Sequence, residues 1–104
     1  LLETVGRKTG IKRMLPLIYK KVGDDYVIIA SKGGFPKHPV WYLNLVDNPQ
    51  CDIRVGKDIF SARARVAEGE ERSRLWEELV EIYPPYTAYQ EATDRVIPVV
   101  VLEV

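Results

Sequence analysis

The sequence has very little cysteine, histidine or methionine, with one residue of each among 104. The single cysteine, Cys51, excludes an internal disulfide and fits a reducing compartment. The single histidine, His38, cannot supply a histidine-rich metal site, so we predict no metal centre. Because His38 lies in a loop before a proline, we expect an exposed side chain rather than a member of a Ser-His-Asp triad.

The chain also lacks net charge and long hydrophobic runs. Its 15 basic and 15 acidic residues cancel, which disfavours a nucleic-acid partner and requires any anion to be bound by a local cluster of cations. No apolar run approaches the roughly 20 residues of a membrane-spanning helix, so we expect a cytoplasmic protein. The sequence begins at Leu1 without a methionine. This predicts that an N-terminal segment is missing, and a peripheral membrane contact through that segment stays open.

Cations are concentrated in one stretch near the start of the chain. The segment from Arg7 to Arg13 holds four of them and is interrupted by glycine. Backbone N–H groups of a glycine turn, together with Arg7, Lys8 and Thr9, can form a phosphate cradle. The spacing is not that of a Walker A loop. A solvated basic hairpin turn is the alternative interpretation of this stretch by itself.

A second glycine-containing turn follows the apolar run Tyr26–Ala30. Ser31 and Lys32 add a hydroxyl and a cation, and the two glycines after them let a ligand approach the backbone closely. Pro39 then suits the first turn of a helix. A strand end, a glycine turn and a helix start in one short stretch are typical of an anion or cofactor site, although an ordinary surface turn fits the same residues.

Hydrophobic periodicity predicts five strands and three helical segments. The predicted strands are Met14–Lys21, Tyr26–Ala30, Cys51–Val55, Phe60–Val66 and Val96–Val104. The predicted helices are Pro39–Asp47, Glu70–Ile82 and one or two turns within Tyr86–Thr93, whereas residues 1–5 are too few to assign. Strands joined mainly by hairpins predict an α+β fold, mainly β, with a small and largely antiparallel barrel and helices outside it. No G-x-G-x-x-G motif follows the first strand, which argues against a Rossmann NAD site.

The first predicted helix offers two apolar faces. Val40, Leu43 and Val46 form one row, and Trp41 and Leu45 lie one turn apart beside it. Trp41 can either anchor this helix in the core or flank a planar ligand, and the sequence leaves both alternatives open.

Three tyrosines recur near the end of the chain, on both sides of a Pro-Pro pair. Tyr83, Tyr86 and Tyr89 can pack a terminal helix onto the barrel, or they can form a pocket wall with hydroxyls directed inward. Together with the two glycine turns, the second alternative favours a planar ligand that carries an anionic tail. A phosphorylated, flavin-like cofactor belongs to this class.

Ordered motifs over nearly the full length of the chain resemble those of the deazaflavin-dependent nitroreductase family. The motifs are Gly6-Arg7-Lys8-Thr9-Gly10, Ala30-Ser31-Lys32-Gly33-Gly34, Pro39-Val40-Trp41-Tyr42-Leu43-Asn44-Leu45, Asn48-Pro49, Tyr83-Pro84-Pro85-Tyr86-Thr87-Ala88-Tyr89-Gln90 and Thr93-Asp94-Arg95-Val96-Ile97-Pro98. The resemblance implies a single split β-barrel domain over residues 1–104, similar to the FMN-binding split barrels. It also implies coenzyme F420, an 8-hydroxy-5-deazaflavin, as the cofactor rather than FMN.

The resemblance further implies roles for individual residues. At the cofactor it places Arg7, Lys8 and Thr9 on the phosphate, Arg13 and Lys32 near the phosphate or the polyglutamate tail, the backbone of Ala30, Ser31 and Lys32 at the ring, and Pro39, Val40, Trp41 and Asn44 along the groove. On the substrate side, as catalytic candidates, it places Ser31, Tyr83, Tyr86 and Tyr89.

The implied activity is that of an oxidoreductase. It transfers a hydride from C5 of the reduced deazaflavin to a flat electrophile, either a quinone such as menaquinone or a nitroaromatic such as a nitroimidazole. The residues themselves leave other classes open. One is a non-catalytic module that carries a flavin or a tetrapyrrole. Another, which the balanced charge disfavours, is a nucleic-acid-binding barrel that uses Arg7, Lys8, Arg63 and Arg65.

Overall fold

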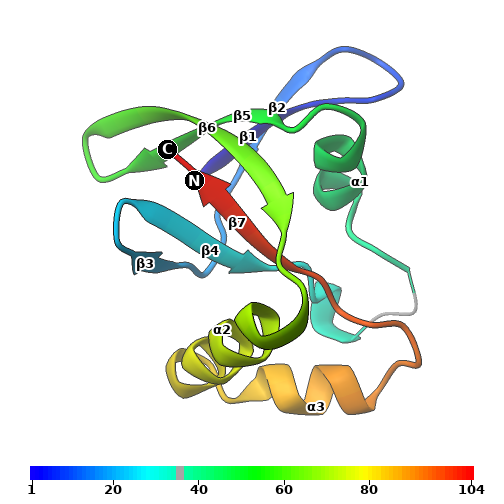
Figure 1. The fold of residues 1–104 in the computed structure, drawn as a ribbon. Coiled ribbons are helices and arrows are strands. Elements are labelled where there is room, and N and C mark those ends of the chain that lie inside the picture. The colour runs from blue at the N-terminus through cyan, green and yellow to red at the C-terminus, as the bar shows by residue number, and fades with distance from the viewer. Residues whose placement is uncertain (35–36) are drawn as a thin grey trace.

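A bent antiparallel sheet with helices against it makes up the fold (Figure 1). The computed structural model describes residues 1–34 and 37–104. Its strands are β1 (Leu2–Val5), β2 (Lys12–Leu15), β3 (Lys20–Val22), β4 (Asp25–Ile29), β5 (Gln50–Val55), β6 (Asp58–Val66) and β7 (Val99–Glu103). Its helices are the short 3-10 helix η1 (Lys32–Gly34), then α1 (Val40–Asp47), α2 (Gly69–Ile82) and α3 (Pro85–Glu91).

The seven strands form one sheet in the order β2-β1-β5-β6-β7-β4-β3, and each pair is antiparallel. The predicted α+β, antiparallel fold class is therefore confirmed. The sheet is not closed, because within the described residues no hydrogen-bonded pairing joins the two edge strands, β2 and β3. Residues 16–19 connect β2 to β3 along the chain. The barrel is therefore open between two edge strands that are neighbours in the sequence.

The predicted single strand Met14–Lys21 is wrong, since the structure divides it between opposite edges of the sheet. Its first residues belong to β2 and pair with β1, while its last residues belong to β3 and pair with β4. Pro16 lacks a backbone N–H, so a ladder through this position would lose a hydrogen bond. Residues 1–5, left unassigned by the sequence, supply β1, which pairs with both β2 and β5.

Strands β4 and β7 are buried on both faces of the sheet. Tyr26 and Ile28 of β4 point into the interior of the barrel, whereas Val27 and Ile29 point toward α2 and α3. Strand β7 alternates in the same way, and the two strands pair from Tyr26↔Leu102 to Ile29↔Val99. A strand that is covered on both sides reads as a continuous apolar run, which is the pattern that the sequence shows here.

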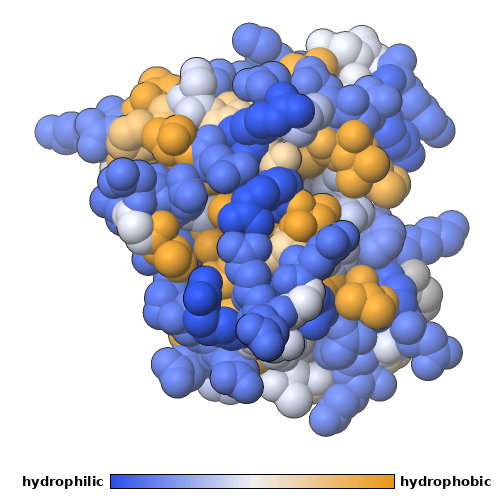
Figure 2. Space-filling view, in the orientation of Figure 1, coloured by the Kyte–Doolittle hydropathy of each residue, from blue (hydrophilic) through white to orange (hydrophobic). Residues whose placement is uncertain are grey.

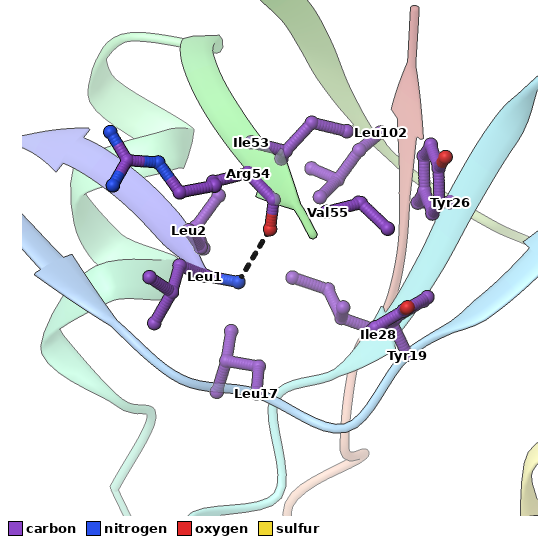
Figure 3. Close-up of a pocket in the computed structure, with 10 residues that line it drawn as sticks. All are labelled: Leu1, Leu2, Leu17, Tyr19, Tyr26, Ile28, Ile53, Arg54, Val55 and Leu102. Atoms are coloured by element: carbon purple, nitrogen blue, oxygen red, sulfur yellow. Dashed lines mark hydrogen bonds between the residues drawn. The ribbon is translucent and has the colours of Figure 1, made fainter. Parts of the chain in front are cut away.

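The barrel interior is filled by apolar side chains and holds a cavity of only about 20 Å³. Figure 3 shows side chains from several strands converging there, with Leu17 reaching in from the irregular segment between β2 and β3. The N-terminal amine donates to the Arg54 carbonyl at 3.0 Å beside this cavity. A space of this size admits about one water-sized probe, so the barrel interior is packing rather than a ligand site.

Helix α1 buries a different face from the row Val40, Leu43 and Val46. Trp41, Asn44 and Leu45 are buried, whereas Val40 and Val46 are 60% and 63% exposed. Burial of the large indole of Trp41 outweighs burial of two valines. The same rotation brings Asn44 to the loop between β1 and β2. Pro39 caps the helix instead of lying in its first turn.

The surface has no single large apolar face in the view of Figure 2, where hydrophobic residues form separate patches among hydrophilic ones. Single exposed apolar side chains such as Ile59 and Val96 are ordinary for a protein surface. Over the described ranges, 1–34 and 37–104, no helix has both the length and the hydropathy that crossing a bilayer requires.

Gly34 lets the turn after β4 pack directly against α3. Its φ is +78°, and a Cβ atom at this position would lie 2.7 Å from the Tyr89 carbonyl oxygen and 2.9 Å from the Tyr89 Cα. Backbone atoms cannot move aside as a flexible side chain can. Glycine is therefore required here both for its dihedral angle and for its lack of a side chain.

We expect Gly34→Ala to lower the free energy of unfolding by roughly 2–4 kcal/mol, because left-handed strain adds to displacement of α3. Gly56→Ala is the matched control, since Gly56 also has a positive φ of +61° but nothing lies within 4 Å of the added Cβ. The control should cost only the strain, about 1–2 kcal/mol. Urea denaturation measures both, and equal losses would contradict close packing of the turn on α3.

Candidate functional site

A groove of about 420 Å³ lies between the β1–β2 loop and helix α1. Its lining residues are Gly6, Arg7, Lys8, Thr9, Arg13, Val40 and Asn44. Six of the residues that the sequence assigns to the cofactor thus line a single groove, although they come from two separate segments of the chain. We call it the basic groove.

The β1–β2 loop is held in shape by its own backbone. The Gly6 N–H donates to the Ile11 carbonyl at 2.9 Å, and the Gly10 N–H donates to the Gly6 carbonyl at 2.8 Å. The Arg7 N–H donates to Oδ1 of the buried Asn44 at 3.1 Å, which ties the loop to α1. These three backbone donors are engaged within the protein, so they shape the loop and do not serve a ligand.

Thr9 and Gly6 depend on each other. Thr9 Oγ1 accepts the Ile11 N–H at 3.2 Å, which leaves the hydroxyl proton of Thr9 able to donate. A Cβ atom on Gly6 would lie 2.7 Å from this oxygen, so a larger residue at position 6 would displace the hydroxyl. The glycine at the start of the loop therefore sets the place of Thr9.

Three cations of the basic groove have no acidic partner in the described part of the chain. Within residues 1–34 and 37–104, no carboxylate lies within 4.0 Å of the charged groups of Arg7, Lys8 or Arg13, whereas the neighbouring Lys12 approaches Glu3 at 3.9 Å. Two guanidinium groups, an ammonium and a hydroxyl are a donor set that suits phosphate or carboxylate oxygens. The groove therefore fits the anionic part of a phosphorylated cofactor.

A second pocket, of about 270 Å³, contains all four predicted catalytic residues. We call it the tyrosine pocket, and its lining residues are Pro16, Leu17, Ile18, Ile29, Ser31, Tyr83, Tyr86 and Tyr89. The tyrosines come from the end of α2 and from α3, Ser31 follows β4, and residues 16–18 belong to the segment between the open edges of the sheet. The pocket therefore lies where the helix layer meets the open side of the barrel.

The three tyrosines contact one another edge to face or at a tilt, with ring centroids 5.0–6.2 Å apart. The hydroxyls of Tyr83 and Tyr89 are 3.0 Å apart and share a hydrogen bond. Burial, reinforced by the two neighbouring phenols, raises the pKa of Tyr86 to about 12. The hydrogen bond that Tyr89 shares with Tyr83 raises the pKa of Tyr89 as well. Both phenols are thus neutral near pH 7 and can act as hydrogen-bond donors.

The turn after β4 lies beside the tyrosine pocket and is held from the opposite side by Arg95. Arg95 Nη2 donates to the Ser31 carbonyl at 2.7 Å, and Nη1 donates to the Ala30 carbonyl at 3.1 Å. The Ala30 N–H donates to the Pro98 carbonyl at 3.0 Å, so both polar backbone groups of Ala30 are engaged. Lys32 adopts a positive φ of +46°, and the Ser31 carbonyl also accepts the Gly34 N–H.

Some predicted cofactor residues do not line the basic groove. The side chains of Ala30 and Trp41 are buried in the barrel core, and Pro39 is buried at the start of α1. The alternative of Trp41 as a core anchor is therefore the one that the structure supports. Lys32 is exposed in η1, and Gly33 contributes to the same short helix.

His38 is half-buried, so the expectation of an exposed side chain is wrong. Its ring contacts Tyr42 at 4.8 Å between centroids, and its Nδ1 lies 3.1 Å from Arg95 Nη1. Because a guanidinium can only donate, Nδ1 is the acceptor and the imidazole is neutral. Burial and the charge of Arg95 lower the pKa of His38, in agreement with this state.

Four candidate positions, Pro16, Leu17, Ile29 and Arg95, escaped the interpretation of the sequence. Pro16 and Leu17 were assigned to a regular strand and Ile29 to the core, yet all three line the tyrosine pocket. Ile18 also lines it, and the resemblance to the family had associated this position with the width and polarity of the substrate pocket. Arg95 was seen only as part of the motif Thr93–Pro98. The neighbouring residues gave no signal for its role, because the carbonyl groups that it bonds lie more than 60 positions away. In the described part of the chain, no group of three or more His, Cys, Asp or Glu side chains is placed to hold a metal ion.

Comparisons with known proteins give the family. The model of the F420H(2)-dependent quinone reductase family matches residues 1–104. An F420H(2)-dependent quinone reductase of Mycobacterium tuberculosis strain H37Rv is 45% identical over 105 residues, which cover 98% of this chain and 70% of that protein.

Two solved structures agree with this assignment. A structure of an F420-H2 dependent reductase superposes with a TM-score of 0.90 at 46% identity, covering 98% of this chain and 90% of the other. A structure described as a domain-swapped dimer gives the same TM-score and identity, covering 98% and 77%. This chain therefore belongs to the F420H(2)-dependent quinone reductase family of oxidoreductases, whose cofactor is coenzyme F420.

Proposed function

We propose that this protein reduces a quinone, and also accepts nitroaromatic compounds, with electrons from reduced coenzyme F420. The observation that carries the proposal is the placement of two chemically different hollows. The basic groove offers cations, whereas the tyrosine pocket offers phenols and the side of the turn after β4 at Ser31. When bound, the reduced deazaflavin supplies a hydride to the acceptor.

The basic groove is proposed to hold the phosphate and the anionic tail of the cofactor. Arg7, Lys8 and Arg13 supply positive charge that no described carboxylate neutralises. Asn44 keeps the loop in position through the Arg7 N–H, so the cations are presented from an anchored backbone. Since the chain is neutral overall, this local cluster rather than a general basic surface gives the attraction for an anion.

The tyrosine pocket is proposed to hold the acceptor. Its walls combine aliphatic side chains with phenols, which suits a flat, mostly apolar ring that bears carbonyl or nitro oxygens. Tyr83, Tyr86 and Tyr89 can donate hydrogen bonds to such oxygens, where negative charge develops during reduction. A neutral phenol or the Ser31 hydroxyl can also deliver the proton that quinone reduction requires.

The proposal is tested with purified protein and reduced F420. Oxidation of F420, followed by its absorbance after addition of menadione or a nitroimidazole, is expected for the reductase. A protein that retains F420 without oxidising it when either acceptor is added would instead be a carrier. Retention of FMN or haem in preference to F420 would contradict the proposed cofactor.

Lys8→Ala tests the phosphate assignment. We expect the dissociation constant for F420 to rise roughly tenfold, because one charge-assisted contact to the anion is lost. The difference should shrink at high ionic strength, since the site is open to solvent. Lys57→Ala removes a cation from the β5–β6 turn, outside the groove, and should leave binding unchanged. Unaltered affinity of Lys8→Ala at low salt would count against the assignment.

Tyr83→Phe and Tyr86→Phe test the tyrosine pocket. We expect turnover with one class of acceptor to fall roughly 10- to 100-fold, because a hydrogen-bond or proton donor is removed while the ring remains. Affinity for F420 should change little, since the basic groove is intact. Tyr42→Phe, on α1, serves as the control. If steady-state kinetics with menadione and with a nitroimidazole match those of the wild type for both variants, the phenols have no part in turnover.

A further inference from the structure

Arg95 connects three segments that meet at the candidate site, and none of the roles proposed above uses it. It lies in the loop between α3 and β7, and its guanidinium bonds the carbonyls of Ala30 and Ser31 and the ring of His38. Burial lowers the pKa of Arg95, but the group stays charged because the ordinary value is far above neutral. Taking a guanidinium partly out of water costs free energy unless its N–H groups are hydrogen-bonded. The hydrogen bonds of Arg95 offset this cost, and we ask what its partly buried position achieves.

Two adjacent carbonyls on one guanidinium require an unusual backbone. In a β-strand successive carbonyls point in opposite directions, so a single side chain on one side cannot reach both. Here β4 ends at Ile29, and the chain turns at Ser31 into η1. Arg95 thus donates hydrogen bonds to the backbone at the point where the extended conformation of β4 ends.

The direction of the carbonyls fixes the direction of the next peptide N–H groups. No peptide bond in the described residues is cis, and in a trans peptide the C=O and the following N–H point in opposite directions. Since the Ala30 and Ser31 carbonyls point toward Arg95, the N–H groups of Ser31 and Lys32 point away from it. Ser31 lines the tyrosine pocket, and Arg95 is not among the residues that line it.

We infer that Arg95 is a positioning residue that orients the peptide N–H groups of Ser31 and Lys32 toward the polar edge of the deazaflavin ring. This inference rests on the proposed function for the identity of the ligand, and on the resemblance to the family for the place of its ring at the backbone of Ala30, Ser31 and Lys32. The ring edge carries carbonyl and ring-nitrogen acceptors, and two oriented peptide dipoles can stabilise the negative charge that accumulates there. Arg95 touches neither ligand and acts through the backbone that it holds.

Arg95 is itself held on the scaffold. Its backbone N–H donates to Thr93 Oγ1 at 3.3 Å, and its carbonyl accepts from Gln90 Nε2 at 2.8 Å. Gln90 Oε1 in turn accepts the Ile97 N–H at 2.9 Å. Gln90 follows Tyr89 in α3, so the helix that bears two of the tyrosines also braces the loop of Arg95. The positions of the turn and of the tyrosine pocket therefore both depend on α3.

The test compares Arg95→Met and Arg95→Lys with Arg72→Met as a matched control. Arg72 is also half-buried and donates to a backbone carbonyl of the same loop, that of Ile97 at 2.8 Å, but it does not contact the turn. Circular dichroism establishes that each variant is folded. Arg95→Lys keeps the charge but lacks the planar fork that reaches two carbonyls, so it remains informative where Arg95→Met fails to fold.

Two measurements decide the inference. The dissociation constant for oxidised F420, from its fluorescence, should rise about tenfold in Arg95→Met, with a smaller rise in Arg95→Lys and no change in Arg72→Met. Guanidinium ion added to Arg95→Met should restore part of the affinity and should not affect Arg72→Met. The ¹⁵N–¹H resonance of Ser31, recorded without cofactor, should shift in the two Arg95 variants only.

An unchanged dissociation constant in folded Arg95 variants would overturn the inference, and so would an equal loss in Arg72→Met. Wild-type protein that fails to bind F420 would contradict the proposed function instead. In that case the cofactor-free spectra still decide whether Arg95 orients the turn, because an unshifted Ser31 resonance in both Arg95 variants would refute the orientation itself.

Discussion

The pairing of β4 with β7 is the interaction on which the rest of the structure depends. Both strands alternate between two apolar environments, so one register, Ile28↔Val100 and its neighbours, builds the barrel interior and the helix-facing core at once. A slip by one residue would exchange the two sets of side chains, and neither environment would then be filled correctly. The helices α2 and α3 can cover only the face that presents Val27, Ile29, Val99 and Val101. The end of β4 and the tyrosines of α3 are consequently neighbours.

The turn after β4 inherits its position from that pairing. Backbone at a strand end has unpaired groups, and here Arg95 and the Pro98 carbonyl satisfy those of Ala30, while Gly34 allows the chain to lie against α3. The tyrosine pocket is therefore bounded by elements that are packed on both sides. The basic groove differs, since its cations extend from a hairpin loop at the edge of the sheet that is attached to α1 through Asn44. The walls of the tyrosine pocket are thus held in place before a ligand binds, whereas the long cationic side chains of the basic groove can adjust to it.

Much of this arrangement could be predicted from the sequence, for identifiable reasons. The β5–β6 hairpin and α2 have strong periodicity. The resemblance to the family, rather than the periodicity, grouped four of the eight residues that line the tyrosine pocket and six of the seven that line the basic groove. The row Val40, Leu43 and Val46 was misleading because helical spacing does not say which of two apolar faces is buried. The buried face is the one that carries Trp41 and Asn44, and Asn44 bonds Arg7, which lies 37 positions away in the sequence. The prediction of one strand over Met14–Lys21 was wrong because apolar and polar residues can keep alternating along the chain where the strand with which it pairs changes. Arg95 escaped because its contacts are long-range and involve carbonyls, which every residue has.

The irregular segment 16–19 shows why an open barrel suits this site. A closed sheet would have to pair β2 with β3, and a regular ladder would place one of every two side chains outside. Released from pairing, the segment turns Leu17 inward, where it fills the barrel and also lines the tyrosine pocket. Pro16 and Ile18 complete the wall of that pocket from the same few residues. The missing ladder costs hydrogen bonds that water can replace at an edge, and it adds Pro16, Leu17 and Ile18 to the apolar wall that Ile29 of β4 begins.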